Sequence, residues 1–110
     1  MQNKVIPLEK EIQLTICKYL EYKRDLMFWR QNTTPVFNKD SDRYQAMPKY
    51  SMRGVPDIIV IKNKEFIGLE VKRPGEKQSK HQVEFQSKCE AVGGKYYVVE
   101  SLDDVIAIGL

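Results

Sequence analysis

Two strand-like runs joined by a two-residue connection limit what this chain can fold into. Residues 57–62 (DIIVIK) and 65–72 (EFIGLEVK) are rich in β-branched and aromatic side chains, and Asn63-Lys64 separates them. Such runs favour strands, and a polar connection of this length is typical of a hairpin turn. The sequence therefore predicts an antiparallel β-hairpin at the centre of the fold.

The register of this hairpin brings charged side chains together. With a two-residue turn, Lys62 faces Glu65, and counting back along both strands places Asp57 opposite Glu70. Like charges in opposite positions destabilise a sheet unless something compensates them, and a divalent cation does so. Lys72 lies two residues beyond Glu70, so its side chain projects from the same face. The hairpin thus predicts a site of two carboxylates and one ammonium group.

The segments around the hairpin predict helices and further strands. Apolar residues at three- and four-residue spacing indicate a helix before it, and capping-box and Gly-Gly signals delimit a helix after it. Helices are predicted over residues 7–23, 79–92 and 102–108, strands over 26–30 and 96–99, and a long loop over 31–53. A strand that follows a crossover helix can pair in parallel. We therefore predict an α/β fold in which helices flank a central mixed sheet.

Composition fits one small domain. At 110 residues and 42% hydrophobic content the chain can bury a core, so we expect residues 1–110 to form a single domain. The formal charge of +3, from 18 Lys and Arg against 15 Asp and Glu, permits a polyanionic partner without requiring one.

Cysteine usage and hydropathy indicate a soluble intracellular protein. Cys17 and Cys89 lie in helix-like apolar patterns rather than in a CxxC pair, so we expect reduced thiols in the core. The first residues lack an apolar run of signal-peptide length, and nowhere does a run of about 18 apolar residues occur. We expect no membrane contact.

The chemistry of the hairpin residues points to phosphodiester hydrolysis. Carboxylate oxygens suit Mg²⁺ or Mn²⁺ and leave coordination positions for water and phosphate oxygens. An ammonium group beside them can orient or deprotonate the attacking water and offset charge on the phosphorane. Glu70-x-Lys72 alone also arises by chance on a solvated strand. The joint pattern is more specific, because Gly54-Val55-Pro56-Asp57 places an aspartate at the start of the partner strand.

Four segments together resemble the VRR-Nuc family of PD-(D/E)xK nucleases. They are GVPDIIVI (54–61), GLEVK (68–72), KHQVEFQ (80–86) and GGKYYVVES (93–101). Such domains occur alone in phage and bacteria and as the nuclease part of a larger eukaryotic DNA-crosslink repair enzyme. The compact chain resembles the stand-alone type, which is similar to junction resolvases. The resemblance implies a restriction-endonuclease-like PD-(D/E)xK fold.

The resemblance also implies a ligand set. Asp57, Glu70 and the backbone carbonyl of Val71 would hold Mg²⁺ or Mn²⁺, and Lys72 would be catalytic. The family adds an acidic residue from the first helix to this set.

Two acidic residues of the first helix compete for that place. Glu11 is preferred, because it precedes the apolar-Gln pair Ile12-Gln13 as the family's glutamate does, and it borders the apolar face. Glu9 is the alternative.

Gln82 is a catalytic candidate with two readings. The family tends to carry a glutamine near the start of the helix after the E-x-K strand, where it could contact metal-bound water or phosphate. Gln82 could also close a capping box with Ser79, and both roles are compatible. His81 is the only histidine, and its place at the helix start suggests solvent exposure.

Other residues near the motifs are weaker candidates. Phe28 and Trp29 could stack on a base, but aromatic residues in a short strand are more often core, so they are not assigned to the site. Basic residues that flank the motifs could form a rim that grips phosphates: Arg30, Arg53, Arg73, Lys77 and Lys80.

These features favour a metal-dependent endonuclease, and the resemblance implies one that cuts branched DNA as a symmetric homodimer, a Holliday-junction resolvase. Paired active sites suit a four-way junction. The alternatives are a general or restriction-like DNA nuclease and a DNA-binding module without turnover. We expect the protein in the cytoplasm of a bacterial or phage-infected cell.

Overall fold

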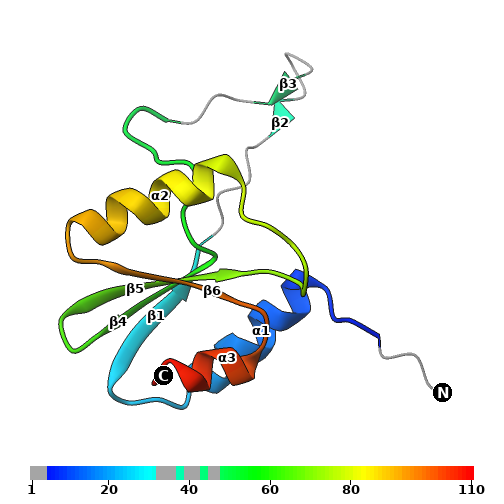
Figure 1. The fold of residues 1–110 in the computed structure, drawn as a ribbon, viewed down its shortest axis with the longest axis vertical. Coiled ribbons are helices and arrows are strands. Elements are labelled where there is room, and N and C mark those ends of the chain that lie inside the picture. Colours follow the sequence, from blue (N-terminus) through cyan, green and yellow to red (C-terminus); the bar gives the residue numbers. More distant parts are fainter. Residues whose placement is uncertain (1–4, 32–36, 39–42, 45–47) are drawn as a thin grey trace.

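The computed structural model describes residues 5–31, 37–38, 43–44 and 48–110 (Figure 1). The chain forms three helices and six strands over these residues. In chain order they are α1 (Glu9–Leu20), β1 (Leu26–Arg30), β2 (Phe37–Asn38), β3 (Arg43–Tyr44), β4 (Ile58–Lys62), β5 (Glu65–Val71), α2 (Lys80–Ala91), β6 (Lys95–Val99) and α3 (Leu102–Ala107). None of these helices is both long and apolar enough to cross a membrane.

A four-stranded mixed sheet forms the centre of the fold. Its strand order is β1-β4-β5-β6, with antiparallel pairing from β1 to β5 and parallel pairing between β5 and β6. The parallel pair follows from the crossover through α2, as predicted. The α/β prediction is thus confirmed.

The predicted loop over residues 31–53 contains a short strand pair. β2 and β3 form a separate two-stranded antiparallel sheet in which Phe37 pairs with Tyr44. The prediction of an uninterrupted loop is therefore wrong at these positions, because two-residue strands are too short for a sequence pattern to reveal. Residues 32–36, 39–42 and 45–47 of that predicted loop lie outside the described residues.

The hairpin has the predicted register. Lys62 pairs with Glu65, and the pairing continues from there to Ile58 and Leu69. The turn residues Asn63 and Lys64 have φ of 52° and 65°, the left-handed values that a type I′ turn needs at both positions. The turn therefore also determines how the two strands face each other beyond Ile58 and Leu69, where the charged residues of the hairpin follow.

Helices cover the two faces of the sheet differently (Figure 1). On the α1 face, defined here by Ile58, Val60, Leu69 and Val71, the strands pack on α1 and α3 in one apolar core. On the opposite α2 face, defined by Asp57, Ile59, Glu70 and Lys72, α2 lies over the sheet without a single buried residue. The main core of the described structure therefore lies between the sheet and α1 and α3.

Both cysteines are free thiols, and the prediction of a core position is right for Cys17 and wrong for Cys89. Cys17 packs against the edge of the core, and Cys89 lies half-buried on α2 outside that core. Burial raises the pKa of each thiol.

Candidate active site

Close backbone packing positions Asp57 at the start of β4. Gly54 has φ of +75° and lies against the backbone of His81 in the first turn of α2, where a Cβ would collide. Gly68 similarly leaves room for the ring of Pro56, which is fully buried. The segment before β4 is therefore held between α2 and β5, and Asp57 follows it directly.

Asp57 and Glu70 form the carboxylate pair that the register predicts. The register places Asp57 opposite Glu70, and the Asp57 Oδ2 accepts a hydrogen bond from the Val71 backbone N–H at 2.8 Å. Glu70 is only 1% exposed. Burial, followed by the nearby Asp57 carboxylate, raises the pKa of Glu70 to about 9. The carboxyl groups of Asp57 and Glu70 thus lie together, and ionisation of Glu70 beside Asp57 is unfavourable.

Two neutral side chains hold the carboxyl group of Glu70. Gln82 Nε2 donates to Glu70 Oε1 at 2.8 Å, and the hydroxyl of Tyr96 donates to Glu70 Oε2 at 3.3 Å. Burial and the neighbouring Glu70 carboxyl raise the pKa of Tyr96, so its hydroxyl stays protonated and remains a donor.

Gln82 closes the predicted capping box and also contacts Glu70. Its Oε1 accepts from the Ser79 backbone N–H at 2.8 Å, while the Ser79 hydroxyl accepts from the Gln82 backbone N–H at 3.2 Å. The capping box is therefore formed, and the remaining amide N–H reaches Glu70. Gln82 links the start of α2 directly to the carboxylate pair.

Lys72 lies at the end of β5, beside the carboxylates. Its backbone N–H donates to the Val99 carbonyl at 3.0 Å, which fixes the residue against β6, and the residue is 8% exposed. The ammonium charge acts on Glu70 and on Glu9, lowering the pKa of each against stronger effects that raise it. Among the described residues, no ion pair within 4.0 Å includes Lys72.

The acidic residue of α1 nearest this site is Glu9, which favours Glu9 over Glu11 as the candidate from this helix. Burial raises the pKa of Glu9, and Glu76, Lys72 and Asp57 act on it as neighbouring groups. The carboxylate of Glu11 instead accepts from the Leu8 backbone N–H at 3.4 Å and lines a separate cavity of about 540 Å³ beside α1 and β1. Two residues along a helix differ by about 200° in direction, so only one can face the site.

A turn after β5 ties the start of α1 to the site. Glu76 Oε1 accepts from the Arg73 backbone N–H at 2.7 Å, and the nearby Glu76 carboxyl helps to raise the pKa of Glu9. The Arg73 Nη2 donates to the Ile6 carbonyl at 3.2 Å. These contacts fasten the residues before α1 and hold Glu9 near Lys72.

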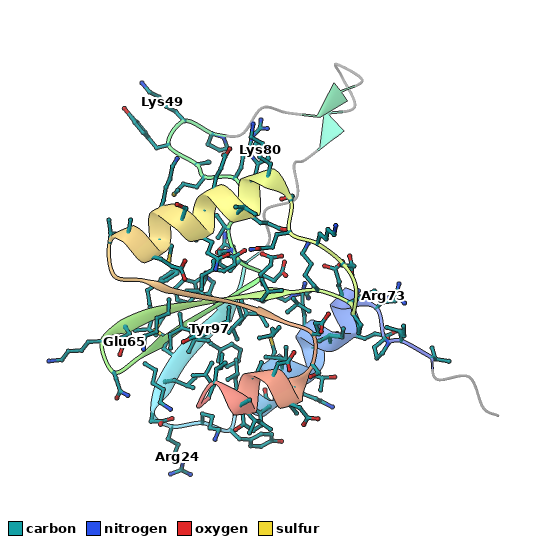
Figure 2. The ribbon with its side chains drawn as sticks, in the orientation of Figure 1. Arg24, Lys49, Glu65, Arg73, Lys80 and Tyr97 are labelled. Carbon is teal, nitrogen blue, oxygen red and sulfur yellow. The ribbon has the colours of Figure 1, made fainter. Side chains whose placement is uncertain are left out.

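Two of the five predicted DNA-binding residues donate hydrogen bonds to α1 or to the segment before it. Arg73 reaches back to the segment before α1, as described above and visible in Figure 2. Arg30 projects to the α1 face, where its Nε donates to Gln13 Oε1 at 2.7 Å. The sequence prediction placed both by proximity to a motif, but strand alternation and long-range contacts direct their side chains elsewhere.

The other three basic residues surround the start of α2. Arg53, Lys77 and Lys80 are exposed, and Figure 2 shows Lys80 at the beginning of the helix that carries Gln82. The Arg53 Nη1 lies 3.5 Å from His81 Nε2. His81 is itself exposed, as expected from its position. These cations could contact phosphate groups near the acidic centre.

The donor set suits a hard divalent cation. No group of three His, Cys, Asp or Glu side chains is gathered to enclose a metal anywhere in residues 5–31 and 48–110 or the short strands between them. An open site needs fewer protein ligands, because Mg²⁺ and Mn²⁺ retain water. The pair Asp57 and Glu70 offers oxygen ligands, and a cation would relieve the effect that raises the pKa of Glu70.

Comparison with known proteins bears on the fold. No family model matches the chain, and neither does any curated protein. A solved structure described as "VRR_NUC domain" superposes with a TM-score of 0.63 at 20% sequence identity, covering 91% of each chain. Agreement over nearly the whole length shows a shared topology. The chain therefore has the fold of a VRR_NUC domain, of the PD-(D/E)xK type that the sequence predicted.

Proposed function

We propose that the protein is a divalent-metal-dependent endodeoxyribonuclease. One observation carries the proposal: Asp57, buried Glu70 and Lys72 occupy one end of the α2 face, around a carboxyl group whose pKa is raised to about 9. A pair of carboxylates with an adjacent ammonium group is an arrangement suited to phosphodiester hydrolysis. The VRR_NUC fold supports a nuclease.

Asp57, Glu70 and the Val71 carbonyl would hold Mg²⁺ or Mn²⁺, and Glu9 would complete the shell through a water that the ion retains. The ion would supply a Lewis acid for the phosphoryl oxygen and lower the pKa of bound water. Glu9 replaces Glu11 in this set because its carboxyl lies near Lys72 and Asp57.

The chain's own residues prepare the reaction. Gln82 and Tyr96 each donate to one oxygen of Glu70, which fixes the orientation of that carboxyl. Lys72 positions the attacking water and offsets the negative charge that develops on the pentavalent phosphorus. Arg53, Lys77 and Lys80 bind phosphates on either side of the cut.

The proposed substrate is branched DNA, with the four-way junction as its leading form. The resemblance to stand-alone VRR-Nuc proteins supports this choice, together with a homodimer that brings two sites to one junction. The protein would act in the cytoplasm of a bacterial or phage-infected cell.

Cleavage of labelled four-way junction, flap and plain duplex DNA with Mg²⁺ or Mn²⁺ tests the proposal. Wild-type protein is compared with Asp57→Asn and Lys72→Met, and with Glu11→Gln as the matched acidic control. Junction-selective cutting that both site variants lose and the control retains would support a resolvase. Equal cutting of plain duplex would indicate a general nuclease, and DNA binding without cutting in any metal would indicate a binding module.

A further inference from the structure

Trp29 lies on the same sheet face as the carboxylate pair. It pairs with Ile59, while its neighbour Phe28 pairs with Val60. Val60 and Phe28 belong to the core on the α1 face, so Trp29 projects to the α2 face. The expectation that both aromatic residues are core is thus right for Phe28 and wrong for Trp29, which remains 39% exposed.

The indole is close to the acidic centre. The Gln31 backbone N–H donates to the Asp57 carbonyl at 2.7 Å, so the β1–β4 pairing extends to these two residues. Trp29 lies two residues before Gln31, which places its Cα about 8 Å from that of Asp57 for ordinary strand rise and spacing. A nucleotide next to a phosphate at Asp57 and Glu70 spans this separation.

The indole N–H of Trp29 already has a hydrogen-bond acceptor within the protein. Trp29 Nε1 donates to Gln31 Oε1 at 3.0 Å, and Gln31 projects from the same face two residues further along. The open part of the residue therefore offers an aromatic surface rather than a hydrogen-bond donor. Met27, one step further along this face of β1, is 64% exposed and continues the apolar strip away from the site.

This strip is next to β4 and at the opposite edge of the sheet from β6, on which α2 packs. Bases in a duplex are stacked on one another, so only an unpaired or extruded base can lie flat against such a ring. Aromatic side chains bind single-stranded nucleic acid in this way with little sequence preference. A phosphate at the neighbouring carboxylates would bring a base to the indole.

We infer that Trp29 stacks on an unpaired nucleobase beside the phosphate at Asp57 and Glu70. The inference rests on the proposed nuclease function and deepens it by naming a substrate class. Branched DNA that exposes unpaired nucleotides, such as a flap or fork, binds better than fully paired DNA, so within the proposed class of branched DNA the inference favours these forms over the four-way junction. Trp29 is a specificity-determining residue in this account, and its ring contributes to binding rather than to bond cleavage.

The single tryptophan of the chain makes a direct test available. Fluorescence excited at the long-wavelength edge of the indole band, where the six tyrosines absorb little, reports on Trp29. The Asp57→Asn protein in EDTA binds without turnover and with one fewer charge facing phosphate. Titration with oligothymidylate or a flap quenches the emission if a base stacks on the indole. A blunt duplex of equal length leaves it nearly unchanged.

Fluorescence anisotropy with labelled DNA measures the contribution of the ring. Trp29→Ala weakens binding of the single strand about 10-fold and leaves duplex binding unaltered, while Trp29→Phe retains most of the affinity. Met27→Ala, on the same strip but further from the site, serves as the matched control with less than about 2-fold change. Equal affinities for Trp29→Ala and wild type overturn the inference.

Cleavage by the wild type separates this inference from the proposed function. If Mg²⁺ or Mn²⁺ supports cutting but no DNA quenches Trp29, the stacking site fails and the nuclease stands. If oligothymidylate quenches Trp29 but nothing is cut, the nuclease fails and the stacking site stands. A blue shift of the emission with rising protein concentration, without DNA, also overturns the inference, because a second copy would then cover the ring.

Discussion

The two faces of the central sheet divide stability and chemistry between them. The α1 face is an apolar core in which Ile16, Leu20, Ile58 and Leu69 are 0% exposed. The α2 face buries the charged residues Glu70 and Lys72, while α2 contributes no buried residue. Burial of apolar surface stabilises a fold, whereas burial of ionisable groups without a close ion-pair partner opposes it. The candidate site therefore lies on the α2 face, which contributes less to folding than the α1 face.

We expect the largest effect from a substitution on the α2 face, and the affected quantity is the rate of DNA cleavage. Replacing Lys72 with Met keeps most of its buried aliphatic volume and removes the charge, so DNA cleavage should fall about 10²–10³-fold. The thermal midpoint of the metal-free protein should change little. Lys62→Met, whose ammonium pairs with Asp25 at 3.4 Å on the other face, is the control for charge loss. Equal loss of cleavage in both variants would refute a special role for Lys72.

The largest effect on stability should come from the α1 face. Leu69→Ala removes a fully buried side chain, so the free energy of unfolding should fall by about 2–5 kcal/mol. Val83→Ala on α2, where Val83 is 50% exposed, should change it by no more than about 0.5 kcal/mol. Urea unfolding measures both, and similar losses would break the contrast between the faces.

Metal affinity should distinguish the two acidic residues of α1. Glu9→Gln should weaken Mn²⁺ binding about 10-fold, because its carboxyl lies near Asp57 and Lys72. Glu11→Gln should leave the affinity unchanged, since its carboxylate accepts from the Leu8 N–H. Isothermal titration calorimetry measures both constants. A larger loss in the Glu11 variant would restore the preference drawn from the sequence.

The pH dependence of stability should reveal the cost of the carboxylate pair. Because the pKa of Glu70 is raised from 4.5 to about 9, the folded protein retains a proton that the unfolded chain has lost between these values. The metal-free protein should therefore lose stability as the pH rises through this window. Glu70→Gln should show a smaller decline, measured by urea unfolding at several pH values.

Added Mn²⁺ should reverse the decline at the upper end of this window, because a cation stabilises the ionised pair. An identical pH profile in Glu70→Gln and wild type would mean that other groups set the dependence.

The smallest effect should come from the tie between the turn after β5 and α1. Glu76→Ala removes the acceptor of the Arg73 N–H at 2.7 Å and the contact with Glu9. Cleavage should fall about 3-fold, in line with the loss of one partly exposed hydrogen-bonded contact. Glu84→Ala, an exposed acid on α2, is the matched control. A steady-state assay that finds no difference would show that α1 holds Glu9 in place unaided.

Local patterns determined much of the site. The two-residue turn at Asn63-Lys64 sets the hairpin register, and the register alone brings Asp57 to Glu70 with Lys72 on the same face. The capping box places Gln82 at the start of α2 in the same way. The hairpin turn and the capping box depend only on residues close together in the sequence, so the sequence alone is enough to predict them.

Only the tertiary structure determines which residues from distant parts of the sequence lie at the site. Tyr96 faces Glu70 because β6 pairs in parallel with β5 so that Tyr96 lies beside Gly68, and nothing in the run YYVV distinguishes Tyr96 from Tyr97. Glu9 rather than Glu11 lies near Lys72 and Asp57 because the turn after β5 meets the start of α1.

The same reason applies to Arg30, Arg73 and Trp29. Their positions in the sequence are near the motifs, but their directions depend on pairing between distant segments. Sequence periodicity defines which side of an element is apolar, whereas packing of elements far apart along the chain defines what that side meets.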